Sequence, residues 1–253
     1  MNSLPFQVLA AFAWGVLVTP LSISLSRRFR VLDMPGDRKI HSGVIPRGAG
    51  IVLWLGYLLW VLLFGWSVPG TRVIAIGGTL VFLAGYVDDM RQTSPFFRLA
   101  FHVSAAALVS LTLPLPALGK ALVAFWITGC TNAYNLIDGM DGLCLSIALS
   151  TACCFSAFGG MQLWMPLAGL SCGVLAWNFP LPRAKTFLGD GGSTLLGFLC
   201  ASQIATTLSP GFIDPLGMVP VLALLGGMPV FDTLAAVGRR LLVGRSPFLP
   251  DRG

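Results

Sequence analysis

Nine apolar segments, separated by short polar loops, limit the folds open to this chain more than any other feature. They cover residues 4–25, 51–66, 72–87, 99–113, 119–131, 143–158, 163–179, 192–208 and 216–237. A helix needs about 20 apolar residues to cross a bilayer, and several of these segments approach or reach that length. One globular core could not bury so much apolar sequence: soluble domains carry about 25% charged residues, whereas this chain carries 10%.

The fold class follows from the pattern within these segments. Strands of a membrane barrel alternate apolar and polar residues over about ten positions, and these segments do not alternate. Backbone polar groups inside a bilayer must be hydrogen-bonded within the protein, which a helix achieves alone. The sequence therefore predicts an all-α, polytopic transmembrane helical bundle with about nine or ten spans, in a single domain over residues 1–253.

The basic residues give this bundle an orientation. If the N-terminus lies outside, the inner segments are 26–50, 88–98, 132–142, 180–191 and 238–253. These segments hold 14 of the 16 lysines and arginines, as expected of cytoplasmic loops. The same distribution explains the net charge of +6 without a nucleic-acid partner.

Acidic residues gather on the same side of the bundle. Nine of the ten aspartates fall there, all except Asp214, if Asp232 near the end of the last apolar segment is included. Asp88 and Asp89 end one apolar segment together, and adjacent carboxylates repel each other unless a cation lies near them. A plain helix end is the weaker interpretation, because acidic residues oppose the dipole of a helix C-terminus.

The densest polar stretch is NAYNLIDGMDGL, residues 132–143, which lies between two apolar segments. Its polar residues are Asn132, Asn135, Asp138 and Asp141. Ionisable residues beside a membrane span are costly and therefore indicate function. A plain Asx-rich turn is the alternative, and the two glycines favour a break between two helices.

Two further loops have the composition of phosphate-binding loops. Arg38, Lys39, His41 and Arg47 stand among glycines that allow close backbone approach. The alternative for this loop is a basic segment attracted to anionic lipid. In GDGGS, before the segment 192–208, Asp190 is either a helix N-cap or the ligand of a cation that bridges a bound phosphate.

Two other positions also leave alternatives open. Phe187 could pack in lipid or stack on a base. The arginines of the last inner segment, including Arg245, could anchor the membrane edge or bind a ligand. Taken together, aspartates with basic and amide groups on one face suit Mg²⁺-assisted phosphoryl transfer, in which the metal neutralises phosphate oxygens and basic residues hold the diphosphate.

The sequence resembles the polyprenyl-phosphate N-acetylhexosamine-1-phosphate transferases over its whole length. The matching pieces are RKIHSGVIPRGAG, the pair Asp88 and Asp89, NAYNLIDGMDGL, FLGDGGS, and PVFDT followed by GRSPFLPDR. Their order and their alternation with apolar segments make the resemblance specific.

The resemblance implies a reaction and its partners. A sugar-1-phosphate passes from a UDP-sugar to polyprenyl (undecaprenyl) phosphate, which gives polyprenyl-diphosphate-sugar and UMP. The implied cofactor is Mg²⁺, with Mn²⁺ as the alternative. The implied location is the bacterial cytoplasmic (inner) membrane, with the active site on its cytoplasmic face, and a homodimer is expected.

The resemblance also assigns roles to residues. Asp88 and Asp89 are the expected catalytic pair, with Asp88 as the candidate base. Asp190 is the expected metal ligand, together with Asp89. The expected substrate-binding residues are Lys39, His41, Asn135, Asp138, Asp141, Asn178, Phe187 and Arg245. Within this set, the ring of Phe187 is expected to stack on uracil.

Two features place the chain within the family. The peptidoglycan branch commonly has a lysine four residues after the first aspartate of its pair, where this chain has Gln92. We therefore expect an enzyme that initiates a surface polysaccharide such as O-antigen. The family pattern continues into a His-rich motif, so we expect the chain ending at Gly253 to lack this loop and the last span or spans.

Two other classes of protein remain as alternatives. A transporter or proton or cation pathway could use intramembrane aspartates, but it needs carboxylates at mid-span depth or on both faces. The predicted carboxylates lie on one face, which disfavours this class. A non-catalytic family member remains the second alternative.

Overall fold

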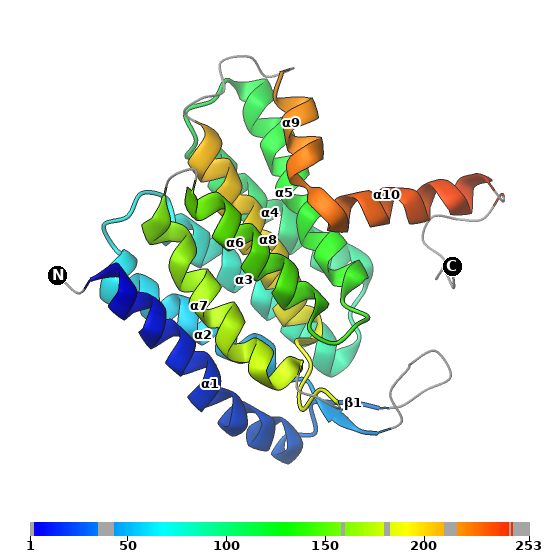
Figure 1. The fold of residues 1–253 in the computed structure, drawn as a ribbon. Coiled ribbons are helices and arrows are strands. Elements are labelled where there is room, and N and C mark those ends of the chain that lie inside the picture. The colour runs from blue at the N-terminus through cyan, green and yellow to red at the C-terminus, as the bar shows by residue number, and fades with distance from the viewer. Residues whose placement is uncertain are drawn as a thin grey trace.

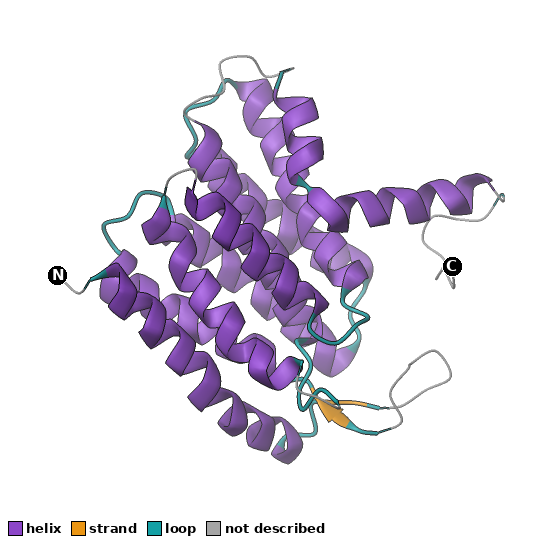
Figure 2. Cartoon of the chain, viewed as in Figure 1, coloured by secondary structure: helices purple, strands orange, loops and turns teal. Residues whose placement is uncertain are grey.

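The computed structural model describes residues 3–34, 43–157, 160–179, 183–209, 217–242 and 244 (Figure 1). Helices dominate these residues, and a short hairpin supplies the strands (Figure 2). The helices are α1 (Leu4–Arg28), α2 (Ala49–Trp60), α3 (Thr71–Arg91), α4 (Pro95–Leu111), α5 (Ala117–Ile137), α6 (Leu143–Ala157), α7 (Met161–Asn178), α8 (Gly189–Leu208), α9 (Met218–Leu225) and α10 (Gly227–Leu242). A π-helical turn, η1 (Val61–Gly65), continues α2, and the strands are β1 (Leu32–Asp33) and β2 (Ile45–Pro46).

The described residues of each apolar segment are mainly helical, which confirms the predicted all-α class. In the described part of the chain, α1 and α3 are long and apolar enough to cross a membrane. The pair α9 and α10 would add a third span if it is counted as one. These apolar helices indicate a membrane protein, whereas the expected nine or ten spans and their orientation stay predictions.

The last apolar segment differs from the single helix that the sequence predicts. It forms α9 and α10, which are bent by 98° where they meet. Gly227 adopts a φ of +58° at the start of α10, a left-handed conformation that glycine tolerates and other residues rarely adopt. As a result, α10 projects away from the bundle (Figure 1).

Helix α8 lies in the middle of the bundle, and all residues from Gly191 to Ala205 are buried. It packs against α2, α3, α5 and α6. Glycines allow the closest contacts: a Cβ added to Gly50 would lie 2.7 Å from the Cα of Gly192. A Cβ added to Gly85 would lie 2.7 Å from the carbonyl oxygen of Asp190. Small residues at such crossings bring the end of α3 against the start of α8.

The hairpin of β1 and β2 lies beside the same end of α8. Its strands are antiparallel, and Asp33 pairs with Ile45. The amide of Phe187 donates to the carbonyl of Pro46 over 2.8 Å, and the amide of Ala49 donates to the carbonyl of Phe187 over 3.2 Å. The hairpin is therefore joined through its backbone to the residues that lead into α8.

Candidate active site

The candidate site forms where α3 ends and α8 begins, which we call the polar end of the bundle. Asp88 and Asp89 lie in the last turn of α3, and Asp190 lies in the first turn of α8. Gly189 has a φ of +71°, and a Cβ there would lie 2.5 Å from Oδ2 of Asp89. Only glycine therefore allows α8 to begin this close to the carboxylate.

Asp89 is enclosed at this contact, with 2% of its side chain exposed. Its Oδ1 accepts a hydrogen bond from the amide of Asp190 over 3.0 Å, and its Oδ2 accepts one from the amide of Gly191 over 3.1 Å. A carboxylate in this position satisfies two of the free N–H groups of the helix and complements its dipole. Asp89 thus acts as a cap supplied by another helix.

This cap corrects two expectations from the sequence. The expected pairing of Asp89 with Asp190 as metal ligands does not fit, because both oxygens of Asp89 already accept hydrogen bonds from the amides of Asp190 and Gly191. The residue at the N-cap position is Leu188, so the interpretation of Asp190 as an N-cap is wrong. The Asp190 side chain is therefore left available for other contacts.

Arg47 joins Asp89 to the hairpin. Its Nη1 donates to Oδ1 of Asp89 over 2.8 Å, and its Nε donates to Oδ1 of Asp33 over 3.0 Å. Its Nη2 also contacts Asp33. Burial disfavours the charge of Arg47, but the carboxylates of Asp89 and Asp33 outweigh this and raise the pKa of the guanidinium. We call Asp33, Arg47 and Asp89 the Arg47 cluster.

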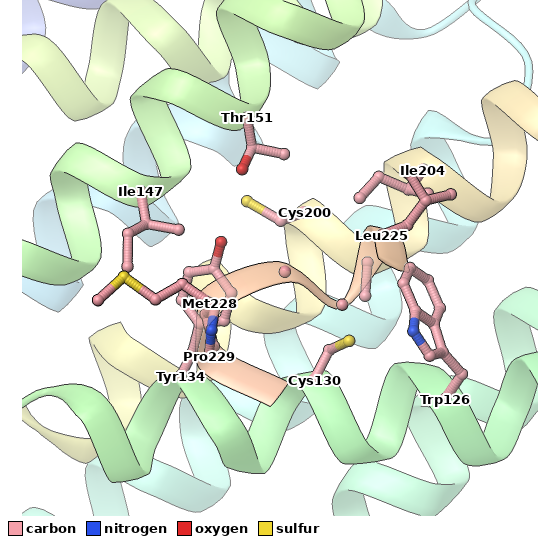
Figure 3. Close-up of a pocket in the computed structure, with 13 residues that line it drawn as sticks. Trp126, Cys130, Tyr134, Ile147, Thr151, Cys200, Ile204, Leu225, Met228 and Pro229 are labelled. Carbon is pink, nitrogen blue, oxygen red and sulfur yellow. The ribbon is translucent and has the colours of Figure 1, made fainter. Parts of the chain in front are cut away.

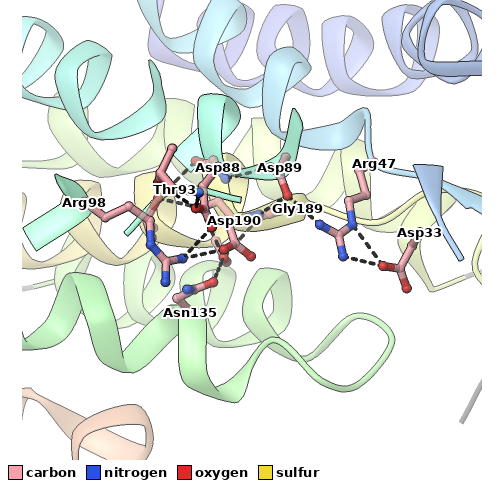
Figure 4. Close-up of polar contacts among 12 residues, drawn as sticks. Asp33, Arg47, Asp88, Asp89, Thr93, Arg98, Asn135, Gly189 and Asp190 are labelled. Atoms are coloured by element: carbon pink, nitrogen blue, oxygen red, sulfur yellow. Dashed lines mark hydrogen bonds and ion pairs between the residues drawn. The ribbon is translucent and has the colours of Figure 1, made fainter. Parts of the chain in front are cut away.

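A second cluster of the same composition lies next to the first, and we call Asp88, Arg98 and Asp190 the Arg98 cluster (Figure 4). Nη1 of Arg98 lies 3.1 Å from Oδ2 of Asp88 and 2.5 Å from Oδ2 of Asp190. Thr93 fixes the first of these carboxylates, because its hydroxyl donates to Oδ1 of Asp88 over 2.6 Å. The side chains of Asp88 and Asp190 are 13% and 31% exposed. Two carboxylates from different helices thus converge on one cationic nitrogen.

Helix α5 and the loop after it lie beside the Arg98 cluster, and we call this surface the neighbouring wall. Asn135 accepts a hydrogen bond from the hydroxyl of Ser193 over 2.9 Å and lies beside Asp190 in the view of Figure 4. Asp138 follows the end of α5 as its C-cap. Burial raises the pKa of the Asp138 carboxyl to about 7, and the charges of Asp190 and Asp89 act in the same direction, against a hydrogen bond with Cys144. Asp138 is therefore partly protonated near neutral pH.

The loop between α5 and α6 is braced from α7 and the segment that follows it. Gly142, with a φ of +74°, donates its amide to Oδ1 of Asn178 over 3.0 Å. The Nδ2 of Asn178 donates to the carbonyl of Thr186 over 2.8 Å. Oδ2 of Asp141 accepts from the amide of Ala184 over 3.2 Å. The predicted helix break is present, and these two side chains connect its loop to the residues before α8.

The structure thus brings most of the expected site residues to one end of the bundle. Phe187 joins them through a β-bridge with Arg47. Lys39, His41 and Arg245 lie outside the described residues. Asp33 and Arg98 were missed as site residues. A signal for Arg98 existed, because a basic residue in the first turn of a helix opposes its dipole and needs a compensating partner.

The donor atoms of the Arg98 cluster fit a hard divalent cation. In the described part of the chain, no group of three or more His, Cys, Asp and Glu residues forms a metal site. Asp88 and Asp190 nevertheless present two carboxylate oxygens to one point, which the guanidinium of Arg98 occupies. Mg²⁺ is commonly held by one or two carboxylates and completed by phosphate oxygens and water. These two residues therefore match the protein's share of such a site.

A cavity of about 110 Å³ lies away from these carboxylates, at the bend between α9 and α10 (Figure 3). Its walls come from α5, α6, α8 and the bend, and include Trp126, Cys130, Tyr134, Cys200 and Met228. Among the described residues, no aspartate lines it. The cavity is mainly apolar and is separate from the acidic clusters.

Comparison with known proteins bears on the chemistry of these clusters. The model of glycosyl transferase family 4 matches residues 71–208. The chain is 30% identical to a decaprenyl-phosphate N-acetylglucosaminephosphotransferase of Mycolicibacterium smegmatis, over 90% of this chain and 68% of that protein. It is 28% identical to a probable undecaprenyl-phosphate N-acetylglucosaminyl 1-phosphate transferase of Bacillus subtilis, over 94% of this chain and 72% of that protein. An undecaprenyl-phosphate alpha-N-acetylglucosaminyl 1-phosphate transferase of Escherichia coli is 27% identical, over 97% of this chain and 73% of that protein.

Proposed function

This chain belongs to glycosyl transferase family 4, and we propose that it transfers a sugar-1-phosphate from a UDP-sugar to polyprenyl phosphate at the Arg98 cluster. The products are polyprenyl-diphosphate-sugar and UMP. The observation that carries this assignment is the convergence of Asp88 and Asp190 on one cationic position. The relatives act on undecaprenyl or decaprenyl phosphate according to their names, so a long polyprenyl phosphate is the proposed acceptor.

The two carboxylates of the Arg98 cluster would hold Mg²⁺, with Mn²⁺ as the alternative ion. When bound, the ion supplies charge neutralisation for the diphosphate of the donor. Arg98 lies at the same point, so its guanidinium would turn to a phosphate oxygen when the carboxylates bind the ion. Phosphoryl transfer depends on positioning and electrostatic stabilisation, which is what these charged groups provide.

Asp88 remains the candidate base of the reaction. Its Oδ1 is fixed by Thr93, and its Oδ2 lies 3.1 Å from Nη1 of Arg98. The second pKa of a phosphate is about 6, so the acceptor is already largely ionised at neutral pH. Proton removal by Asp88 therefore contributes little, and its larger effect is to orient the cation and the acceptor.

The neighbouring wall is the proposed binding surface for the nucleotide sugar. Asn135 bonds to Ser193 in the first turns of α8, and Asp138 lies near enough to Asp190 and Asp89 for their charges to raise its pKa. Asp141 and Asn178 act through the shape of this loop, because their side chains bond to backbone groups. Phe187 is proposed to stack on uracil from the segment before α8. Lys39, His41 and Arg245 are proposed to contact the donor as the family resemblance implies.

The location and the pathway complete the proposal. The polar end faces the cytoplasm in a multi-pass protein of the bacterial inner membrane, with the N-terminus outside and a homodimer as the assembly. The sugar is an N-acetylhexosamine, and the product initiates a surface polysaccharide. A transporter is less well supported, because Asp88, Asp89 and Asp190 lie together at one end of their helices.

The test is release of UMP by membranes that contain the full-length protein. We expect release when UDP-N-acetylglucosamine and undecaprenyl phosphate are both present, loss of release with EDTA, and recovery with excess Mg²⁺. Membranes without the protein are the control. Failure of every UDP-N-acetylhexosamine to release UMP with every polyprenyl phosphate tried would refute the proposed reaction.

A further inference from the structure

We propose that Arg47 and Asp33 are positioning residues for Asp190: with Asp89 they clamp the first turn of α8 and fix the direction of its carboxylate. This inference rests on the proposed function only for the role of Asp190 as a metal ligand. The clamp itself is a statement about this chain and can be tested without turnover.

The first step is the capping of α8. The two oxygens of Asp89 accept from consecutive amides, those of Asp190 and Gly191. One of these amides belongs to the residue whose carboxylate joins the Arg98 cluster. Any shift of Asp89 therefore shifts the backbone that carries the Asp190 side chain, within the same turn of α8.

The second step is the support of Asp89. A carboxylate with 2% of its side chain exposed needs a charged partner or several hydrogen bonds to remain ionised. Nη1 of Arg47 supplies that partner at 2.8 Å. Loss of this guanidinium would leave the buried carboxylate of Asp89 without its charged partner and favour its movement towards water.

The third step is the anchoring of Arg47 itself. Asp33 on β1 accepts a hydrogen bond from Nε of Arg47 and also contacts Nη2. The guanidinium is therefore held by Asp33 on one side and by Asp89 on the other. The backbone of Arg47 forms a β-bridge with Phe187, two residues before α8 begins. Arg47 is thus linked through its backbone to the segment before α8 and, by way of Asp89, through its side chain to the first turn of α8.

The planar fork of arginine suits this task. Separate N–H groups of one guanidinium reach the carboxylates of Asp33 and Asp89 at the same time. A lysine presents a single ammonium group on a flexible stem and can satisfy one of them well. Arg47→Lys should therefore restore part of what Arg47→Met removes.

The experiment is hydrogen–deuterium exchange of the full-length protein in detergent, read on peptides that cover residues 186–196. Arg47→Met is compared with wild type, with Arg47→Lys, and with Arg72→Met as the matched arginine at the other end of α3. We expect amide exchange at the start of α8 to be about tenfold faster in Arg47→Met, the effect of losing about one charge-assisted hydrogen bond. Arg47→Lys should lie between, and Arg72→Met should match wild type.

Mg²⁺ titrations of UMP release give the second readout. The half-saturating Mg²⁺ concentration should rise several-fold in Arg47→Met, whereas kcat at saturating Mg²⁺ should fall less. Unchanged exchange at residues 186–196 in Arg47→Met would overturn the clamp, whatever the activity. If wild type releases no UMP but the exchange differs as expected, the clamp stands and the proposed function fails.

Asp33→Asn serves if Arg47→Met does not fold. It leaves Arg47 bonded to Asp89 and weakens only the outer anchor of the guanidinium. Exchange at the start of α8 should rise by a smaller factor, about threefold, in the same direction. Exchange equal to wild type would contradict the role given to Asp33.

Discussion

The polar end of this protein contains the same set of charges twice, and the two sets are built differently (Figure 4). The Arg47 cluster and the Arg98 cluster each place one guanidinium between two aspartates. In the first, Asp33 and Asp89 have side chains that are 6% and 2% exposed, and both oxygens of Asp89 also bind backbone amides. In the second, Asp88 and Asp190 are 13% and 31% exposed.

We propose that this difference separates a structural role from a chemical one. The oxygens of Asp89 accept hydrogen bonds from buried backbone amides, so this carboxylate cannot bind another group without uncapping the first turn of α8. The carboxylate of Asp190 has the side chain of Arg98 as its partner, which can move away on its own stem. Residue type and charge are equal in the two clusters, and Asp88 also accepts a hydrogen bond from the backbone amide of Thr93. We therefore propose that deeper burial and the cap that Asp89 places on α8 make the Arg47 cluster structural and leave the chemistry to the Arg98 cluster.

Asp190→Asn should have the largest effect on turnover. The substitution keeps the shape of the side chain but removes half of the charge that converges on the cation position. We expect UMP release to fall by about 10³-fold, the upper range for loss of one strong electrostatic contact in an active site. The apparent melting temperature in detergent should stay near that of wild type, because this side chain does not cap a helix. Retention of turnover would show that the metal is held elsewhere.

Asp89→Asn should instead act first on stability. The amide keeps one acceptor for α8 but loses the ion pair with Arg47 at a buried site. Removing one partner of a buried pair costs about 3 kcal/mol, and we expect a comparable loss here. Thermal unfolding in detergent, compared with Asp190→Asn, measures this. Equal melting temperatures for the two variants would mean that the clusters do not differ as described.

Arg98→Met should reduce turnover by about 10²-fold, less than Asp190→Asn, because the two carboxylates that hold the metal remain. The KM for the acceptor phosphate should rise by a larger factor than kcat falls. Kinetics with a short-chain polyprenyl phosphate separate the two parameters. A variant with unchanged KM and kcat would exclude Arg98 from contact with the phosphate.

Asp138 should have the smallest of these effects, a change in the free energy of unfolding whose direction with pH can be measured. Its folded pKa of about 7 is raised above the ordinary value, so the folded state binds this proton more tightly than the unfolded state. Its contribution to stability is therefore full at low pH and is lost as the pH rises towards 7. In Mg²⁺-free buffer, wild type should lose about 1 kcal/mol more between pH 6 and pH 7 than Asp138→Asn does. A steeper loss in the variant would contradict the burial of this carboxyl.

Much of the architecture could be predicted from the sequence. The apolar segments predict the helices, and the two glycines beside Asp138 and Asp141 predict the break between α5 and α6. The distribution of basic and acidic residues predicts that the aspartates share one end. These features depend on local composition, which a single sequence displays.

The division between the two clusters could not be predicted, because it depends on how helices cross. Asp88 and Asp89 are identical neighbours, yet one faces Arg98 and the other faces the start of α8. Their facing follows from the close contact of Gly85 with the Asp190 backbone, a contact between segments far apart in the sequence. The pairing of Arg47 with Asp89 could not be predicted for the same reason, since the two residues lie 42 positions apart in the sequence.

The division of labour between the clusters can be tested by one binding measurement. Mn²⁺ is titrated into the purified full-length protein and followed by electron paramagnetic resonance, with wild type, Asp190→Asn and Asp33→Asn in parallel. We predict that Asp190→Asn abolishes saturable Mn²⁺ binding, whereas Asp33→Asn keeps it with a modestly higher Kd. Loss of binding in Asp33→Asn together with wild-type binding in Asp190→Asn would contradict the assignment and place the metal in the Arg47 cluster.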